Sequence, residues 1–306
     1  MRILFMGTPD IAAGCLQKLI DDKFEIIGVV TQPDKPQNRG KKLGMPPVKE
    51  LALKYDLPVY QPLKARDEEF VKTLQELNPD VIVVVAFGQI LPKSILDIPK
   101  LGCVNVHVSL LPKYRGAAPI QWSIINGDTV TGITTMYMDA GMDTGDMIEK
   151  FEVQIDDKDT YGTLYEKMKV AGGNAIIHTI ERIADPLKLK KEKQPDTFTM
   201  APMIEKEMGE IDWNKTSKEI RNLIRGLNPM PGAYTMITGE RMKIWSAEFT
   251  TFNDENCKPG QIVKADSKSG LLIKTGDGIL EITELQMPNL KRMSERDYLR
   301  GHKINF

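Results

Sequence analysis

Three polar side chains in one stretch of the sequence could act together on a reacting carbonyl group. Asn105 and His107 lie in an otherwise apolar segment, and Asp143 follows in a later turn. An amide can donate a hydrogen bond to a developing oxyanion, and an imidazole can take up or release a proton near neutral pH. A carboxylate can orient the imidazole and accept a proton. These residue types therefore predict acid–base chemistry combined with oxyanion stabilisation.

The sequence does not support two common alternatives to that chemistry. No Ser or Cys lies in a G-x-S-x-G turn that would expose a nucleophile. No second His or Cys stands near His107 at the spacing of a metal site. Direct transfer of a group between two bound substrates is then the expected reaction. A structural explanation stays open for each residue, since Asn, His and Asp often serve packing or backbone hydrogen bonds alone.

The surrounding pattern indicates a parallel α/β sheet that would position these side chains. The segment 102–108 alternates with period two, which places Asn105 and His107 on one face of a strand. The Val/Ile run at 80–86 is typical of a central parallel strand buried on both faces. Open sheets bind ligands at the carboxyl ends of such strands, where these polar residues fall. Further strands are expected at 2–6, 24–31, 131–138 and 148–155, and helices at 11–19, 48–55, 67–77, 117–126 and 160–184.

The composition changes after residue 188. Residues 189–206 are basic and polar and contain a proline, which is typical of a linker. Residues 207–306 show short strand patterns separated by turn residues, which indicates a small β-barrel or sandwich. We therefore expect a domain at 1–188, a linker at 189–206 and a second domain at 207–306. Within the last, a helix is expected at 215–227 and strands at 232–237, 241–249, 260–265, 270–274 and 278–285.

Length and composition fit an ordinary two-domain protein. The chain has 306 residues, at roughly 150 residues a domain. A net charge of −1 gives no global field for nucleic acid, so such contacts would need local patches. No apolar run is long enough to span a bilayer, and the first residues already read as a strand rather than a targeting segment. Three scattered cysteines suggest a reducing compartment, and we expect a cytoplasmic protein.

One basic segment stands out near the N-terminus. Residues 32–47 are rich in proline, glycine and charge, which predicts a loop. Between Asp34 and Lys49 there are five basic residues and one acidic residue. The loop is either simply solvated or an arm that contacts phosphates, and charge counting leaves both open.

Several short motifs are spread along the chain. They are Asn105-x-His107-x-Ser109-Leu110-Leu111-Pro112, Arg115-Gly116-Ala117-Ala118-Pro119, Asp143-Thr144-Gly145-Asp146, Gly7-Thr8-Pro9-Asp10, Thr31-Gln32-Pro33-Asp34, Arg39-Gly40-Lys41-Lys42 and Asn228-Pro229. This set resembles that of the 10-formyltetrahydrofolate-dependent formyltransferases, in the branch that acts on the methionine of initiator tRNA. The resemblance covers essentially the full length.

The resemblance implies a fold and a reaction. It implies a Rossmann-like formyltransferase domain with a parallel-rich sheet, followed by a C-terminal OB-like β-barrel domain that binds tRNA. The α-amino group of methionyl-tRNA would attack the formyl carbon of 10-formyltetrahydrofolate, with no metal, and the chain would act as a monomer. Asn105 and His107 would stabilise the oxyanion, and Asp143 would position His107 and move the proton.

The resemblance also implies binding residues. The folate cosubstrate would contact Ser109, Leu110, Leu111 and Pro112. Its pterin would lie near Phe87, Gly88, Gln89, Ile90, Leu91 and the loop from Asp139 to Asp143. The tRNA would contact Arg39, Lys41 and Lys42 on the basic loop and Lys190, Lys191 and Lys193 in the linker. Val108 departs from the glycine or alanine usual in relatives, and by strand alternation we expect it to affect packing rather than activity.

Four other functions differ from this one in the sequence features that they require. A formyltransferase acting on glycinamide ribonucleotide would be expected to lack the C-terminal domain and to carry a glycine-rich turn near residue 10. An amino-sugar formyltransferase is the other close alternative. A non-catalytic tRNA-binding protein would not need all three of Asn105, His107 and Asp143. A nicotinamide dehydrogenase is disfavoured because only Gly7 remains of a G-x-G-x-x-G fingerprint at the first turn.

Overall fold

The computed structural model describes residues 1–37, 42–185, 187 and 189–304, which form two compact units. The first unit comprises Met1–Gly116, Thr131–Gln154 and Tyr165–Ala201, and the second comprises Ala117–Val130, Ile155–Leu164 and Pro202–Phe306. This division by contacts does not follow the order of the sequence. Two short segments that precede residue 165 in the sequence belong to the second unit, and residues 189–201 belong to the first.

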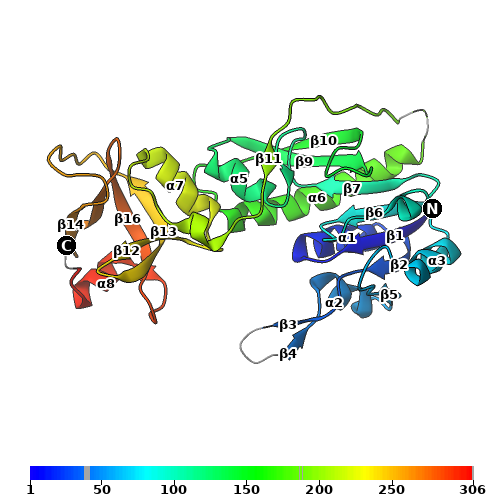
Figure 1. The fold of residues 1–306 in the computed structure, drawn as a ribbon, viewed down its shortest axis with the longest axis horizontal. Helices are drawn as coiled ribbons and strands as arrows, with labels where there is room; N and C mark the ends of the chain where they lie inside the picture. The colour runs from blue at the N-terminus through cyan, green and yellow to red at the C-terminus, as the bar shows by residue number, and fades with distance from the viewer. Residues whose placement is uncertain (38–41, 186, 188, 305–306) are drawn as a thin grey trace. The chain divides into compact units, whose positions relative to one another are not determined.

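The first unit is built on a seven-stranded sheet that is mostly parallel, as expected. Its strand order is β10-β9-β7-β6-β1-β2-β5, and Figure 1 shows β7 between β6 and β9. The pairs β1–β2, β1–β6, β6–β7 and β2–β5 are parallel, whereas β7 and β9 are antiparallel. The strands are β1 (Arg2–Gly7), β2 (Glu25–Val30), β5 (Val59–Tyr60), β6 (Val81–Val85), β7 (Cys103–His107), β9 (Val130–Tyr137) and β10 (Met147–Gln154).

Apolar composition explains which strands lie at the centre. Every residue of β6 is buried, as is all of β1 after Arg2. Strands that are apolar on both faces need cover on both sides, so they occupy the middle of a parallel sheet. The helices of this unit lie close to the ranges expected from the sequence, with the short α4 as an addition. They are α1 (Asp10–Asp21), α2 (Pro47–Lys54), α3 (Glu68–Leu77), α4 (Lys93–Leu96) and α6 (Tyr161–Ile183).

The basic segment is not simply a loop, so that expectation is corrected. Its described residues form a hairpin in which β3 (Lys35–Gln37) pairs antiparallel with β4 (Lys42–Gly44). Asp34 anchors the start of the hairpin, because its carboxylate accepts hydrogen bonds from Lys49 Nζ at 2.7 Å and Gln61 Nε2 at 2.8 Å. The hydrogen bond from Lys49 and then that from Gln61 hold the pKa of Asp34 below its usual value. Arg39 and Lys41 lie outside the described residues.

The second unit is an antiparallel β structure with helices, which agrees with the expected OB-like barrel. Its main sheet has the order β12-β13-β16-β15-β14, with β17 paired to β16. Register shifts around Ser246 let the long strand β13 bend. A capping box between Thr216 and Glu219 starts helix α7. The elements are α5 (Pro119–Ile125), η1 (Lys206–Gly209), α7 (Ser217–Gly226), β12 (Ala233–Ile237), β13 (Glu240–Phe249), β14 (Ile262–Asp266), β15 (Gly270–Lys274), β16 (Ile279–Gln286), β17 (Met293–Ser294) and α8 (Glu295–Gly301).

One further strand pair was not expected. In the first unit, β8 (Arg115–Gly116) pairs in parallel with β11 (Met200–Ala201), which lies in the segment expected as a linker. Two-residue strands carry no periodic pattern, so the sequence gives no signal for them. Among the described residues, no helix combines the length and apolar character needed to cross a membrane.

Candidate active site

Strand β7 delivers Asn105 and His107 to one edge of the site. Asn105 lies opposite Val84 of β6 and Met136 of β9, and His107 lies opposite Thr134 of β9. Their relative exposures are 9% and 6%, so both polar side chains are almost enclosed. Alternation along the strand places them on the same face, as expected from the sequence.

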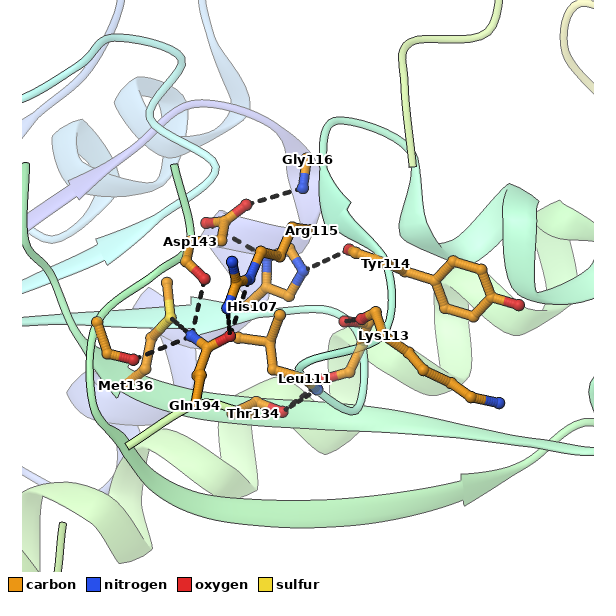
Figure 2. Close-up of polar contacts among 12 residues, drawn as sticks. His107, Leu111, Lys113, Tyr114, Arg115, Gly116, Thr134, Met136, Asp143 and Gln194 are labelled. Atoms are coloured by element: carbon orange, nitrogen blue, oxygen red, sulfur yellow. Dashed lines mark hydrogen bonds and ion pairs between the residues drawn. The ribbon is translucent and has the colours of Figure 1, made fainter. Parts of the chain in front are cut away.

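His107 is held in one orientation by a backbone carbonyl. Its Nε2 lies 2.9 Å from the carbonyl oxygen of Tyr114 (Figure 2). A carbonyl can only accept, so Nε2 carries a proton and donates it to this bond. The other ring nitrogen, Nδ1, lies 3.7 Å from Oδ1 of Asp143. The geometry thus assigns the structural bond to Nε2 and leaves Nδ1 for chemistry beside a carboxylate.

Asp143 is fixed by its own loop. Its backbone adopts a left-handed conformation with φ of 55°, which is uncommon for a non-glycine residue. Its Oδ2 accepts a hydrogen bond of 2.9 Å from the backbone N–H of Gly116 (Figure 2). Within the same loop, Asp139 Oδ1 accepts from Thr144 Oγ1 at 2.6 Å and from Gly141 N at 3.0 Å. Of the three residues that the sequence predicted to lie together, His107 and Asp143 face each other across 3.7 Å.

Asn105 is available for a ligand. Its side chain makes no hydrogen bond to any part of the chain that the structure describes. The amide atoms of Asn105 are still partly exposed. Among the described residues, the side-chain polar atoms that are fully buried without a hydrogen-bond partner are the hydroxyls of Thr31 and Thr131. An accessible amide on the same strand face as His107 can donate to an oxygen bound there.

Two residues of the turn that was expected to contact folate are buried and hydrogen-bonded within the protein. Ser109 is fully buried, and its Oγ donates to the carbonyl of Lys113 at 2.6 Å. Leu111 is also buried, and its N–H donates to Thr134 Oγ1 at 2.9 Å. These contacts shape the turn that carries Tyr114 back to His107. Contact of Ser109, Leu110, Leu111 and Pro112 with folate stays a prediction, and so does the packing effect of the half-buried Val108.

A cavity of about 160 Å³ lies beside Asp143. Gln89, Ile90 and Leu91, which were expected in the pterin pocket, line this cavity, and so does the expected loop from Asp139 to Asp143. The buried Phe87 lies instead in the apolar core, and Gly88 turns the chain with a φ of 84°. The lining residues that the sequence did not indicate are Met136, Met138 and Thr144. Methionine side chains and loop backbone give walls suited to a flat heteroaromatic ring.

Gln194 is a site residue that the sequence did not reveal. Its Nε2 donates to the backbone carbonyls of Asp143 at 2.7 Å and Gly145 at 2.9 Å, and its Oε1 accepts from Arg115 (Figure 2). The residue lies in the segment expected to be a linker, where a polar side chain signals only exposure. Nothing in its local sequence points to the loop 51 residues away.

The expected tRNA-contacting lysines are placed as follows. Lys191 Nζ lies 4.2 Å from the ring centroid of Tyr137, and Lys190 lines a surface hollow with His178 and Arg182. Lys193 is exposed. Lys42 belongs to β4, while its side chain is not described. The contacts of these residues with tRNA stay predictions.

Comparison with known proteins places the chain in a family. A family model described as Formyl transferase matches residues 1–180, and one described as Formyl transferase, C-terminal domain, matches residues 203–303. The α/β unit with its polar strand residues and the following β structure are thus those of a formyl-transferring enzyme. The chain belongs to the formyl transferase family.

Curated relatives within this family are similar over the full length. The chain is 55% identical to "Methionyl-tRNA formyltransferase" of Clostridioides difficile (strain 630) over 99% of this chain and 98% of that protein. It is 48% identical to the protein of the same name in Acetivibrio thermocellus over 99% and 97%. These relatives belong to the branch that the motifs resembled.

Solved structures share the fold at lower identity. A sugar 3N-formyl transferase, WlaRD, matches with a TM-score of 0.68 at 24% identity, over 95% of this chain and 99% of that one. HypX from Aquifex aeolicus in complex with tetrahydrofolic acid matches with a TM-score of 0.63 at 17% identity, over 98% of this chain and 47% of that one. These matches support the parallel-rich α/β fold with its C-terminal β unit.

Proposed function

We propose that the chain transfers the formyl group of 10-formyltetrahydrofolate to the α-amino group of methionyl initiator tRNA. The observation that carries the proposal is the full-length identity of 48–55% to proteins named for formylation of methionyl-tRNA. Support from the site comes from Asp143, which lines a ring-sized cavity and faces His107, and from Asn105, which shares a strand face with His107.

The proposed reaction proceeds through a tetrahedral intermediate. The amine nitrogen bonds to the formyl carbon, the carbonyl oxygen becomes an oxyanion, and the bond to N10 of the folate then breaks. Asn105 donates to that oxyanion through its accessible amide. His107 adds stabilisation as an imidazolium, which carries a proton on each ring nitrogen: Nε2–H donates to the Tyr114 carbonyl and Nδ1–H donates to the oxyanion.

The proton balance of this reaction falls to Asp143. The attacking amine loses one proton and the leaving N10 gains one, so a group near both must carry it. Asp143 faces His107 at 3.7 Å and its carboxylate is only 16% exposed, which suits a base screened from bulk water. Asp143 would accept the amine proton and return it to N10, directly or through one water.

Two binding regions complete the proposal. The pterin ring would occupy the cavity lined by Gln89 to Leu91 and the loop 139–144. The tRNA acceptor end would be held by basic residues of the segment 32–47, namely Arg39, Lys41 and Lys42, and by Lys190, Lys191 and Lys193, through phosphate contacts.

The proposal is tested by offering several amines at once. The protein is incubated with 10-formyltetrahydrofolate and a mixture of aminoacyl-tRNAs, and formylated products are identified by mass spectrometry after deacylation. Parallel arms contain glycinamide ribonucleotide and a nucleotide-linked amino sugar. We expect formylmethionine from initiator tRNA as the main product. Formylation confined to either of the other amines would overturn the proposal.

A further inference from the structure

The segment 192–201 is attached to the active-site unit at both ends. At its start, Glu192 exchanges two backbone hydrogen bonds with Met147 of β10, at 2.8 and 2.9 Å. At its end, Met200 and Ala201 pair with Arg115 and Gly116 of β8. Gln194 lies between these attachments and reaches the loop that carries Asp143.

The amide of Gln194 uses its full hydrogen-bonding capacity within the first unit. Nε2 donates to the carbonyls of Asp143 and Gly145 at 2.7 and 2.9 Å. Oε1 accepts from Arg115 Nε at 2.9 Å and from Arg115 Nη2 at 2.6 Å. A glutamine has two N–H donors and one oxygen with two lone pairs, so all four positions are occupied. No other natural side chain of this length offers the same pattern.

These bonds close a ring around Asp143. Arg115 is followed by Gly116, whose N–H donates to Asp143 Oδ2 at 2.9 Å. Gln194 therefore bonds the main-chain carbonyl of Asp143. Gly116, the neighbour of Arg115 in the chain, bonds the carboxylate of Asp143 (Figure 2). Asp143 has a φ of 55°, a conformation that persists in a non-glycine residue when the surroundings hold it.

We propose that Gln194 is a positioning residue that fixes Asp143 for proton transfer, so that the segment 192–201, which the sequence predicted to be a linker, supplies part of the active site. The inference rests on the proposed function, because it needs Asp143 to act in catalysis. Gln194 itself contacts backbone and Arg115 and has no direct role at the reacting atoms. Its removal would let the carboxylate drift from His107 without emptying either binding region.

The test compares Gln194→Met with a matched control, Gln17→Met. Gln17 also donates two hydrogen bonds, to Asp21 and Tyr55, but lies on α1 away from the site. We expect Gln194→Met to lower kcat on the order of 10²-fold, as a misplaced catalytic group does, with both KM values within about twofold. Gln194→Glu should be at least as impaired, because a carboxylate would face two carbonyl oxygens. Gln17→Met should retain the wild-type kcat.

A double variant separates positioning from a general loss of structure. In an Asp143→Ala background, Gln194→Met should lower the residual rate no further, because the residue that it positions is gone. An equal loss of rate in that background, or a wild-type kcat for Gln194→Met, would overturn the inference. Wild-type protein that fails to formylate methionyl-tRNA would instead overturn the proposed function, and that rate is measured first.

Discussion

At the scale of single residues, the pair of Asp143 and His107 carries the proposed chemistry. The two side chains are 3.7 Å apart, and each is held by a separate backbone group. Asp143→Asn keeps an oxygen to accept from Gly116 but removes the charge and the base. We expect kcat to fall by about 10²–10⁴-fold, and similarly for His107→Ala, with little change in melting temperature. Single-turnover formylation rates and thermal unfolding check this, and near-normal rates would contradict the assigned roles.

Gly116 has a role that only glycine can fill. Its φ is 112°, and an added Cβ would lie 3.0 Å from the carbonyl oxygen of Ala201. Gly116→Ala should destabilise the protein by about 1–3 kcal/mol through backbone strain and should lower kcat by displacing the N–H that holds Asp143. Gly239→Ala is the control for strain alone, because its φ is 83° but nothing lies within 4 Å of the added Cβ. Urea unfolding and kcat are measured for both, and equal effects on kcat would contradict this role.

The site residues that the sequence indicated and the one that it did not differ in how they are held in place. Asn105 and His107 were predictable as a pair because strand alternation is local. The rule that ligands bind at the carboxyl ends of parallel strands does not account for Asp143, because β9 is antiparallel to β7 and ends opposite Val104; the loop after β9 runs back to reach His107. Gln194 was not predictable, since it bonds to backbone carbonyls and to an arginine 79 residues away. Hydrogen bonds to main-chain atoms place no demand on the partner's residue type, so they leave no pattern to read.

At the scale of elements, the β3–β4 hairpin lies in the basic segment that was predicted to contact tRNA. The start of β3 is held by Asp34, whose carboxylate accepts hydrogen bonds from Lys49 and Gln61. If Arg39 contacts a tRNA phosphate, Arg39→Ala should lower kcat/KM for tRNA and reduce the slope of log(kcat/KM) against log[salt] by about 1. Lys93→Ala is the control, because Lys93 is an exposed cation paired with Asp97. Equal slopes for the Arg39 variant and wild type would return the segment to a merely solvated one.

The elements themselves were largely predictable where their patterns were long. The buried run of β6, the helix spacing of α6 and the capping box of α7 all have a periodic or terminal signal. The hairpin β3–β4 was missed because proline and lysine hide any alternation. Helix α8 was missed although Ser294 and Asp297 form a start signal, since the side chain of Ser294 accepts from the N–H of Asp297.

At the scale of the whole molecule, the cysteines report on the two units separately. Cys15 and Cys103 are buried in the first unit, and burial raises the pKa of each thiol to about 12. At pH 8 only about one in 10⁴ of such thiols is ionised, so neither should react with a thiol reagent in the folded protein. Cys257 of the second unit is partly exposed. The pKa of its thiol is also raised, and desolvation is the largest cause. It should therefore react slowly in the folded state, and faster as the pH rises.

A urea series with brief thiol labelling turns this difference into a test of how the active-site unit unfolds. Cys103 begins β7, the strand that ends at His107, whereas Cys15 lies on α1. If the first unit unfolds cooperatively, both should become labelled at one urea concentration, and formylation should be lost there. Cys257→Ser removes the signal of the second unit and should leave that midpoint in place. Labelling of Cys15 well before Cys103 would show instead that α1 detaches while β7, the strand that carries Asn105 and His107, remains folded.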